Sequence, residues 1–301
     1  MTNSIPVDRA IADGYAFGFR HFLAVLGIAW LPYLVFALLA VGLVWLLVPG
    51  LPGMLAQQDI DISQIMGFAR VVVLIAILAF ITGAMVTVGV QRRALELSTR
   101  PVWFWFSLGM PVWRMAGATF VAVVVVFVVA LVMAAICFAI WTAVSSLGGG
   151  VWPVRILDVL AGLVVVIYVG VRLLFFLPAV VVAENSFGLE RAWTLGRGNV
   201  ARGFIVLVAV ILPIAVVFHL LYGAIFGGAA ALHPGAVLSA REIARAALLQ
   251  FGAVGPLAIL LQVLERILLS GVTNGAVASA YRATASASEE PAAPLASSPA
   301  A

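Results

Sequence analysis

Long apolar runs separated by short polar segments dominate the pattern of this 301-residue chain. Six of these runs reach the roughly 20 residues that an α-helix needs to cross a hydrocarbon core of about 30 Å. They cover residues 22–48, 71–90, 116–141, 156–182, 204–226 and 251–272. The first run is too long for the apolar part of a signal peptide, so we interpret it as a retained span. The pattern predicts an all-α integral membrane protein with six transmembrane helices.

Short amphipathic stretches precede the first, third and fifth runs, at residues 5–20, 102–114 and 186–202. In the first stretch, Val7, Ala10, Ile11 and Gly14 follow helical spacing. Gly14 and Gly18 also form a small-xxx-small pair, which allows close helix contact. The second run of each pair carries a Gly-Val dipeptide, at Gly89, Gly170 and Gly271. We interpret this as three repeats of an interfacial amphipathic helix plus a transmembrane hairpin. Chance dipeptides in a chain of this composition are the alternative.

Composition supports the membrane class. Hydrophobic residues make up 65% of the chain and charged residues 9%, with a mean hydropathy of +1.22. A soluble domain carries about 25% charged residues. The single cysteine, Cys137, excludes a disulfide framework and a cysteine-based metal site. Residues 284–301 are small, polar and proline-rich, so we expect a disordered cytoplasmic tail after a polytopic membrane domain at residues 1–283.

The distribution of arginine predicts the orientation. All 16 basic residues are arginine, and the net charge is +4. Ten of them fall on one side of the predicted spans: Arg9, Arg20, Arg92, Arg93, Arg100, Arg114, Arg191, Arg197, Arg202 and Arg282. Four fall on the other side: Arg70, Arg155, Arg241 and Arg245. The positive-inside rule then places both termini in the cytoplasm, and we expect a multi-pass protein of the bacterial inner membrane.

Arg172, Glu265 and Arg266 lie inside predicted spans, and Asp158 lies near the start of the fourth run. Ionisable groups in hydrocarbon cost several kcal/mol unless they are paired or hydrated, so each is a functional candidate. Arg172 and Glu265 lie at comparable depth, and an interhelical ion pair between them is sterically reasonable. We favour a structural role for this pair. His219 is expected to be an imidazole that faces the bundle rather than a metal ligand.

A polar cytoplasmic notch is predicted where the fourth run ends. Pro178 loosens the backbone before this point, and a short amphipathic segment follows it. The notch residues are Glu184, Asn185, Arg191, Trp193, Arg197 and Asn199. The alternative is a capped turn whose charges are solvated.

This segment carries a family resemblance. With Arg172 in the span, the sequence continues as LPAVVVAEN and GLERAWTLGRGN. It resembles the bacterial family that includes the membrane domain of glycerophosphoryl diester phosphodiesterases and related inner-membrane proteins. The matching positions are Pro178, Glu184, Trp193, Gly198 and Asn199. The resemblance implies a multi-helical membrane module of unassigned activity. The family's phosphodiesterase chemistry belongs to a separate soluble barrel, so we do not expect that activity here.

No P-loop, dinucleotide fingerprint, GxSxG elbow or HExxH motif occurs in the sequence. We therefore expect no enzyme activity, cofactor or metal. The main hypothesis is a non-enzymatic membrane protein that organises lipids or partner proteins through its cytoplasmic amphipathic helices. The expected partners are anionic lipid headgroups and membrane or cytoplasmic proteins, with no nucleic acid. The alternative is a transporter or lipid conduit that uses Arg172, Glu265 and Arg266. A lipid-modifying intramembrane enzyme built on Glu184 and His219 is the third hypothesis.

Overall fold

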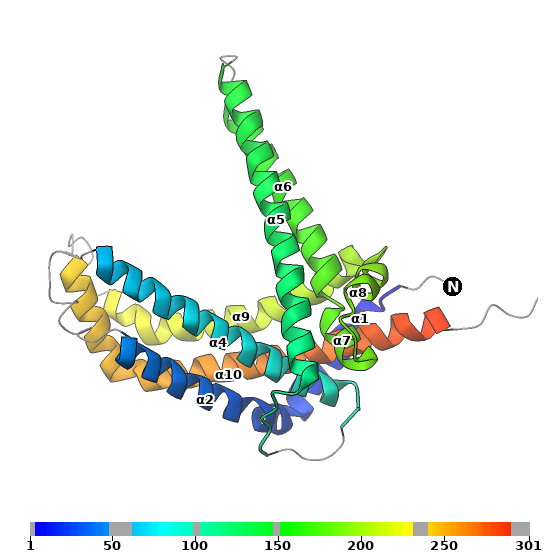
Figure 1. The fold of residues 1–301 in the computed structure, drawn as a ribbon, viewed down its shortest axis with the longest axis horizontal. Coiled ribbons are helices and arrows are strands. Elements are labelled where there is room, and N and C mark those ends of the chain that lie inside the picture. Colours follow the sequence, from blue (N-terminus) through cyan, green and yellow to red (C-terminus); the bar gives the residue numbers. More distant parts are fainter. Residues whose placement is uncertain (1–3, 48–61, 99–102, 147–150, 231–239, 290–301) are drawn as a thin grey trace, which may run out of the picture.

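The chain is all-helical in the computed structural model, which describes residues 4–47, 62–98, 103–146, 151–230 and 240–289 (Figure 1). The helices in these ranges are α1 (Val7–Arg20), α2 (Phe22–Leu47), α4 (Ile62–Ala94), α5 (Met110–Ser146), α6 (Val151–Leu174), α7 (Leu177–Glu184), α8 (Leu189–Gly196), α9 (Val200–Ala230) and α10 (Ala240–Glu289). The described ranges contain no strand.

Five of the described helical segments are long and apolar enough to cross a membrane. They are Phe22–Leu46, Ala69–Ala94, Met110–Ser146, Val154–Glu184 and Val200–Ile225. These segments contain or overlap the first five predicted runs, which agrees with a polytopic membrane protein. The sixth predicted run, residues 251–272, lies within α10. Most side chains of residues 251–259 fall outside the described part of the chain, so a sixth span stays a prediction.

The long helices form three hairpins, α2 with α4, α5 with α6, and α9 with α10. In Figure 1, α2, α4, α9 and α10 run side by side, whereas the α5–α6 hairpin projects across their direction. Most of the buried residues of this hairpin lie at its base, and α5 beyond Ala122 exposes apolar side chains such as Phe127 and Leu131. Exposed apolar surface of this extent suits contact with lipid.

Helix α1 packs closely against α10, and small residues on both helices allow the two backbones to approach each other. A Cβ atom added to Gly14 would lie 2.8 Å from the Ala276 Cβ, and one added to Gly18 would overlap the Val272 Cγ2. On α10, a Cβ atom added to Gly271 would lie 3.2 Å from the Gly18 Cα. Helices approach this closely only where glycine leaves out the side chain. The small-xxx-small pair of α1 is therefore a packing surface within the chain.

Two polar contacts tie the N-terminal region to α9. The Tyr15 hydroxyl donates to the Ala209 carbonyl at 2.9 Å, and burial raises the pKa of Tyr15 above its ordinary value. The Ile5 amide donates to the Asn199 Oδ1 at 3.0 Å, just before α9 begins. The amphipathic helix predicted over residues 5–20 is confirmed, but its apolar face is covered by protein.

The second predicted interfacial helix is wrong over most of its length. Residues 103–109 are irregular, and α5 begins only at Met110, with Pro111 in its first turn, where proline is favoured. The preceding segment is rich in Trp and Phe, which are weaker helix formers than Ala or Leu. The Trp30 Nε1 also donates to the Trp103 carbonyl at 2.8 Å and holds this segment on α2. The hairpins are present, while the threefold repeat stays a prediction.

The predicted tail also requires a correction. Helix α10 continues to Glu289, so residues 284–289 of the predicted disordered tail are helical, and Thr284 is buried. Alanine recurs through this part of the sequence and favours helix. Residues 290–301 lie outside the described part of the chain.

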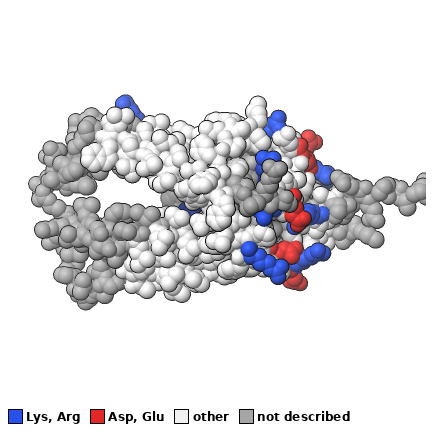
Figure 2. Space-filling view, turned by 90° about the horizontal axis from the view of Figure 1, so that it is seen from below, with Lys and Arg blue, Asp and Glu red and all other residues white. Residues whose placement is uncertain are grey.

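Charged side chains gather at one end of the molecule. Figure 2 shows most of the visible Arg, Asp and Glu residues at the end where α1, α8 and the last turns of α10 lie in Figure 1. This is the same end at which most of the buried apolar residues from α1, α4, α5, α7 and α10 meet. One end is therefore both polar on its surface and tightly packed beneath.

The α1–α10 crossing predicts a large stability effect at Gly18. We expect Gly18→Val to destabilise the protein by about 1–3 kcal/mol, because the new side chain overlaps Val272 and overpacks the contact. The measurement is the midpoint of thermal unfolding in detergent. Gly42→Val is the matched control, since an added Cβ on Gly42 meets nothing within 4 Å. Equal midpoints for the two variants would contradict the proposed contact.

Candidate functional site

The candidate site is centred on the segment between α6 and α9 (the break), where the short helices α7 and α8 are joined to each other and to α6 and α9 by three short connections. Helix α6 ends at Leu174, and Pro178 lies in the first turn of α7, where its missing N–H is tolerated. Asn185 ends α7 in the left-handed conformation with φ of 50°, and Gly188 precedes α8 with φ of 58°. These two residues reverse the chain so that α8 returns to α6.

Arg172 lies at the centre of this return. Its guanidinium carbon lies 3.7 Å from the centroid of the Trp193 ring, and its Nε donates to the Trp193 carbonyl at 3.3 Å. A second nitrogen donates to the Tyr168 hydroxyl at 3.0 Å. Gly196 allows the close approach, because an added Cβ would lie 2.7 Å from the Arg172 carbonyl oxygen. A cation–π contact combined with hydrogen bonds satisfies the Arg172 charge at the end of the span.

The expected ion pair between Arg172 and Glu265 is not formed in the described part of the chain. Glu265 lies instead beside a cavity of about 470 Å³ between α9 and α10, which His219 and Tyr222 also line. The Tyr222 hydroxyl is hydrogen-bonded to Glu265. His219 and Glu265, which are far apart in sequence, therefore share one cavity, and Arg172 belongs to another part of the molecule.

Glu184 joins three helices. Its Oε1 accepts hydrogen bonds from the Arg191 Nε at 3.4 Å and from the Tyr281 hydroxyl at 3.2 Å. Both members of the ion pair are about one-third exposed, at 36% and 34%, so the pair contributes no more than about 1 kcal/mol. Tyr281 is only 9% exposed, and its contact fixes the end of α7 on α10.

The remaining notch residues contact other parts of the protein. One Arg114 nitrogen at the base of α5 donates to both the carbonyl and the Oδ1 of Asn185. Asn199 is 4% exposed, and it accepts from the Ile5 amide and donates to the Leu195 carbonyl. The Arg197 side chain is exposed. Five of the six predicted notch residues are thus divided among several contacts, most of which hold helices together. Tyr281 and Arg114 were missed as partners because they lie 97 and 71 residues from their contacts.

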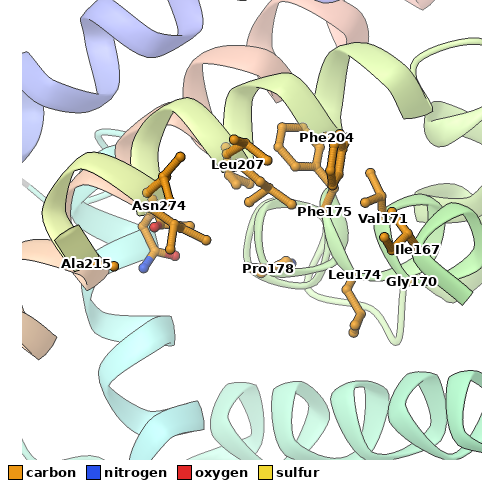
Figure 3. Close-up of a pocket in the computed structure, with 15 residues that line it drawn as sticks. Ile167, Gly170, Val171, Leu174, Phe175, Pro178, Phe204, Leu207, Ala215 and Asn274 are labelled. Atoms are coloured by element: carbon orange, nitrogen blue, oxygen red, sulfur yellow. The ribbon is translucent and has the colours of Figure 1, made fainter. Parts of the chain in front are cut away.

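An apolar groove lies between α6, α9 and α10, next to the break. Its volume is about 590 Å³, and Thr273 and Asn274 are its polar lining residues. Helix α9 contributes one face at helical spacing: Phe204, Leu207, Val208, Ile211, Leu212 and Ala215. Figure 3 shows Ile167 and Gly170 at one side of the groove and Asn274 and Ala215 at the other, with Phe175, Pro178 and Phe204 between them.

Gly170 widens this groove. An added Cβ on Gly170 would meet nothing within 4 Å, so the missing side chain leaves open space. The groove exists because α6 diverges from α9 on the way into the projecting hairpin (Figure 1). Its chemistry suits hydrocarbon, since its walls are almost entirely apolar.

No family model, curated protein or solved structure matches this chain. The resemblance of residues 172–199 to the membrane domain of glycerophosphoryl diester phosphodiesterases therefore stays a prediction. The groove, the break and the charged end are the features of the described residues that bear on function.

The contact between Arg172 and Trp193 predicts an energetic coupling. We expect a double-mutant cycle of Arg172→Ala and Trp193→Ala to give a coupling of about 0.5–2 kcal/mol in thermal unfolding, because either change removes the same cation–π contact. Arg114→Ala with Trp193→Ala is the control cycle. It should be additive, since the hydrogen bonds of Arg114 go to Asn185. Additivity in both cycles would show that the contact contributes nothing.

Proposed function

We propose that this chain is a non-enzymatic polytopic membrane protein that holds an anionic phospholipid at its charged end, with one acyl chain in the groove between α6, α9 and α10. The observation that carries the proposal is the position of the groove. It begins at Phe204, two residues after the exposed Arg202, and extends along α9 to Ala215. These twelve helical residues are separated by eleven steps of about 1.5 Å, so the groove extends about 16 Å, roughly one leaflet of the hydrocarbon core.

The apolar walls alone do not select a lipid. Hydrocarbon surrounds spanning helices, so acyl chains fill any groove of suitable shape without a hydrophobic driving force. Selectivity has to come from the polar end, where Arg197 and Arg202 are exposed beside the start of α9. A basic residue near an anionic membrane surface contributes about 1 kcal/mol. Acyl chain and headgroup would then be held by two neighbouring parts of one site.

The charge distribution supports placing this end in the cytoplasm. Ten arginines lie in segments on the same side of the predicted spans as α1 and α8, and four lie on the opposite side. We infer from the positive-inside rule that both termini are cytoplasmic and that the bound lipid belongs to the inner leaflet.

The alternative of a transporter or conduit has less support. It requires Arg172, Glu265 and Arg266 to line one path through the membrane. Arg172 is engaged with Trp193 and Tyr168, whereas Glu265 is hydrogen-bonded to Tyr222 in a separate cavity.

Filling the groove should expel the lipid. We expect Gly170→Leu to reduce the anionic phospholipid retained after purification at least about fivefold, because an acyl chain that shares the space with the new leucine side chain is overpacked by about 1 kcal/mol or more. The measurement is native mass spectrometry of protein purified in a neutral detergent. Gly42→Leu is the control, because Gly42 also has open space at its Cβ but lies on α2. Equal retention in the two variants would exclude the groove as the acyl site.

Headgroup selectivity should depend on the arginine beside the groove. We expect Arg202→Ala to lower the ratio of retained anionic to zwitterionic phospholipid about fivefold, because one attraction of about 1 kcal/mol is lost. Raising the salt concentration should reduce the difference from wild type. Arg92→Ala removes an equal charge from the last turn of α4 and serves as the control. An equal change in both variants would mean that the whole basic end acts on lipid without a defined site.

A further inference from the structure

A second cavity lies at the charged end, between α1, the end of α4 and the last turns of α10. Its volume is about 680 Å³, within the range of about 300–1,000 Å³ that is typical of small-molecule sites. The charged and titratable residues that line it are Arg9, Asp13, Arg20, His21, Glu96 and Arg282. None of them lines the apolar groove, so an inference from this cavity does not rest on the function proposed above.

Both carboxylates in this cavity already have donors. The Asp13 Oδ2 accepts from the Ser279 hydroxyl at 2.6 Å and lies 3.7 Å from the Arg9 Nε. The Glu96 Oε1 lies 3.2 Å from an Arg282 nitrogen. The acids therefore compensate two of the three guanidinium groups, and the cavity keeps a net positive charge.

Arg20 supplies this excess positive charge. Arg20 is exposed and makes no ion pair with a carboxylate among the described residues. The His21 Nδ1 is buried, and no described group hydrogen-bonds to it. Its ring stacks on Phe17 with 5.0 Å between centroids, which fixes its orientation. His21 also lines the cavity, so it adds a polar side chain to the wall beside Arg20.

We propose that this cavity binds a phosphate group. Three guanidinium groups line this space, those of Arg9 and Arg20 on α1 and of Arg282 on α10. A guanidinium group is planar and can donate two parallel hydrogen bonds to the oxygens of a phosphate. The use of Arg rather than Lys carries no weight, because every basic residue of this chain is Arg. The convergence of these groups carries the argument. The phosphate belongs either to a phospholipid headgroup or to a phosphate ester in solution.

The test uses the full-length protein and two probes. Inorganic pyrophosphate is titrated by calorimetry into protein in a neutral detergent, and phosphatidic acid is offered in nanodiscs of phosphatidylcholine and quantified by native mass spectrometry. We expect Arg20→Gln to weaken binding of one probe about tenfold, since it removes a charge-assisted contact. Arg92→Gln, which removes the same charge outside this cavity, should leave binding unchanged.

A second variant is expected to gain affinity, which a misfolded protein would not do. Asp13→Asn removes a repelling charge and keeps an acceptor for Ser279, so it should tighten binding about fivefold. Loss of pyrophosphate binding in Arg20→Gln would identify a soluble phosphate ester, and loss of phosphatidic acid alone would identify a headgroup. Gly170→Leu should leave pyrophosphate binding unchanged, and the effect of Arg20→Gln on bound phosphatidic acid should persist in a Gly170→Leu background, which separates this site from the acyl groove. The proposal is overturned if Arg20→Gln and Arg92→Gln behave alike with both probes.

Discussion

The close crossing of α1 and α10 is the constraint on which the charged end depends. Gly14 and Gly18 allow α1 to approach the α10 backbone, and Gly271 lies against Gly18 from the other side. Lipid tails are as apolar as a leucine side chain, so helices in a membrane gain little from burying hydrophobic surface and much from dense packing. Because α1 is also bonded to α9 through Tyr15, the crossing fixes three helices at once. A cavity forms along one side of this contact, and the apolar groove lies farther along α9 and α10.

The break after α6 explains why the groove is open. Pro178 and the left-handed residues Asn185 and Gly188 return the chain onto α6, where Arg172 stacks on Trp193. This arrangement closes the charged end tightly. It leaves the outer part of α6 directed along the projecting hairpin and away from α9 (Figure 1). An apolar space between diverging helices is stable in a bilayer because lipid chains occupy it, whereas in water it would be costly.

Apolar length predicted the helices well, and side-chain pairing was predicted poorly. A run of about 20 apolar residues has few alternatives to a spanning helix, so residues 71–90 and 204–226 fall inside α4 and α9. The partner of Arg172 could not be found in this way. Similar depth suggested Glu265, but depth along a helix does not say which face a side chain occupies. The actual partner, Trp193, depends on the turns at Asn185 and Gly188. The irregular segment at residues 103–109 was missed because aromatic residues suit both an interfacial helix and an extended chain.

The charged residues have different roles because the protein satisfies some of their charges and leaves others open. Arg172 is placed where its long side chain reaches an aromatic face and hydrogen-bond acceptors at the end of the span, so its charge is satisfied within the protein. Glu184 is satisfied by Arg191 and Tyr281 in the same way. Such pairs hold the fold and leave little for a ligand to gain. Arg20 and Arg202 are exposed and form no ion pair with a described carboxylate, so an anion that reaches them has no internal competitor. The residues best suited to bind a ligand are therefore those that the packing of the charged end does not use.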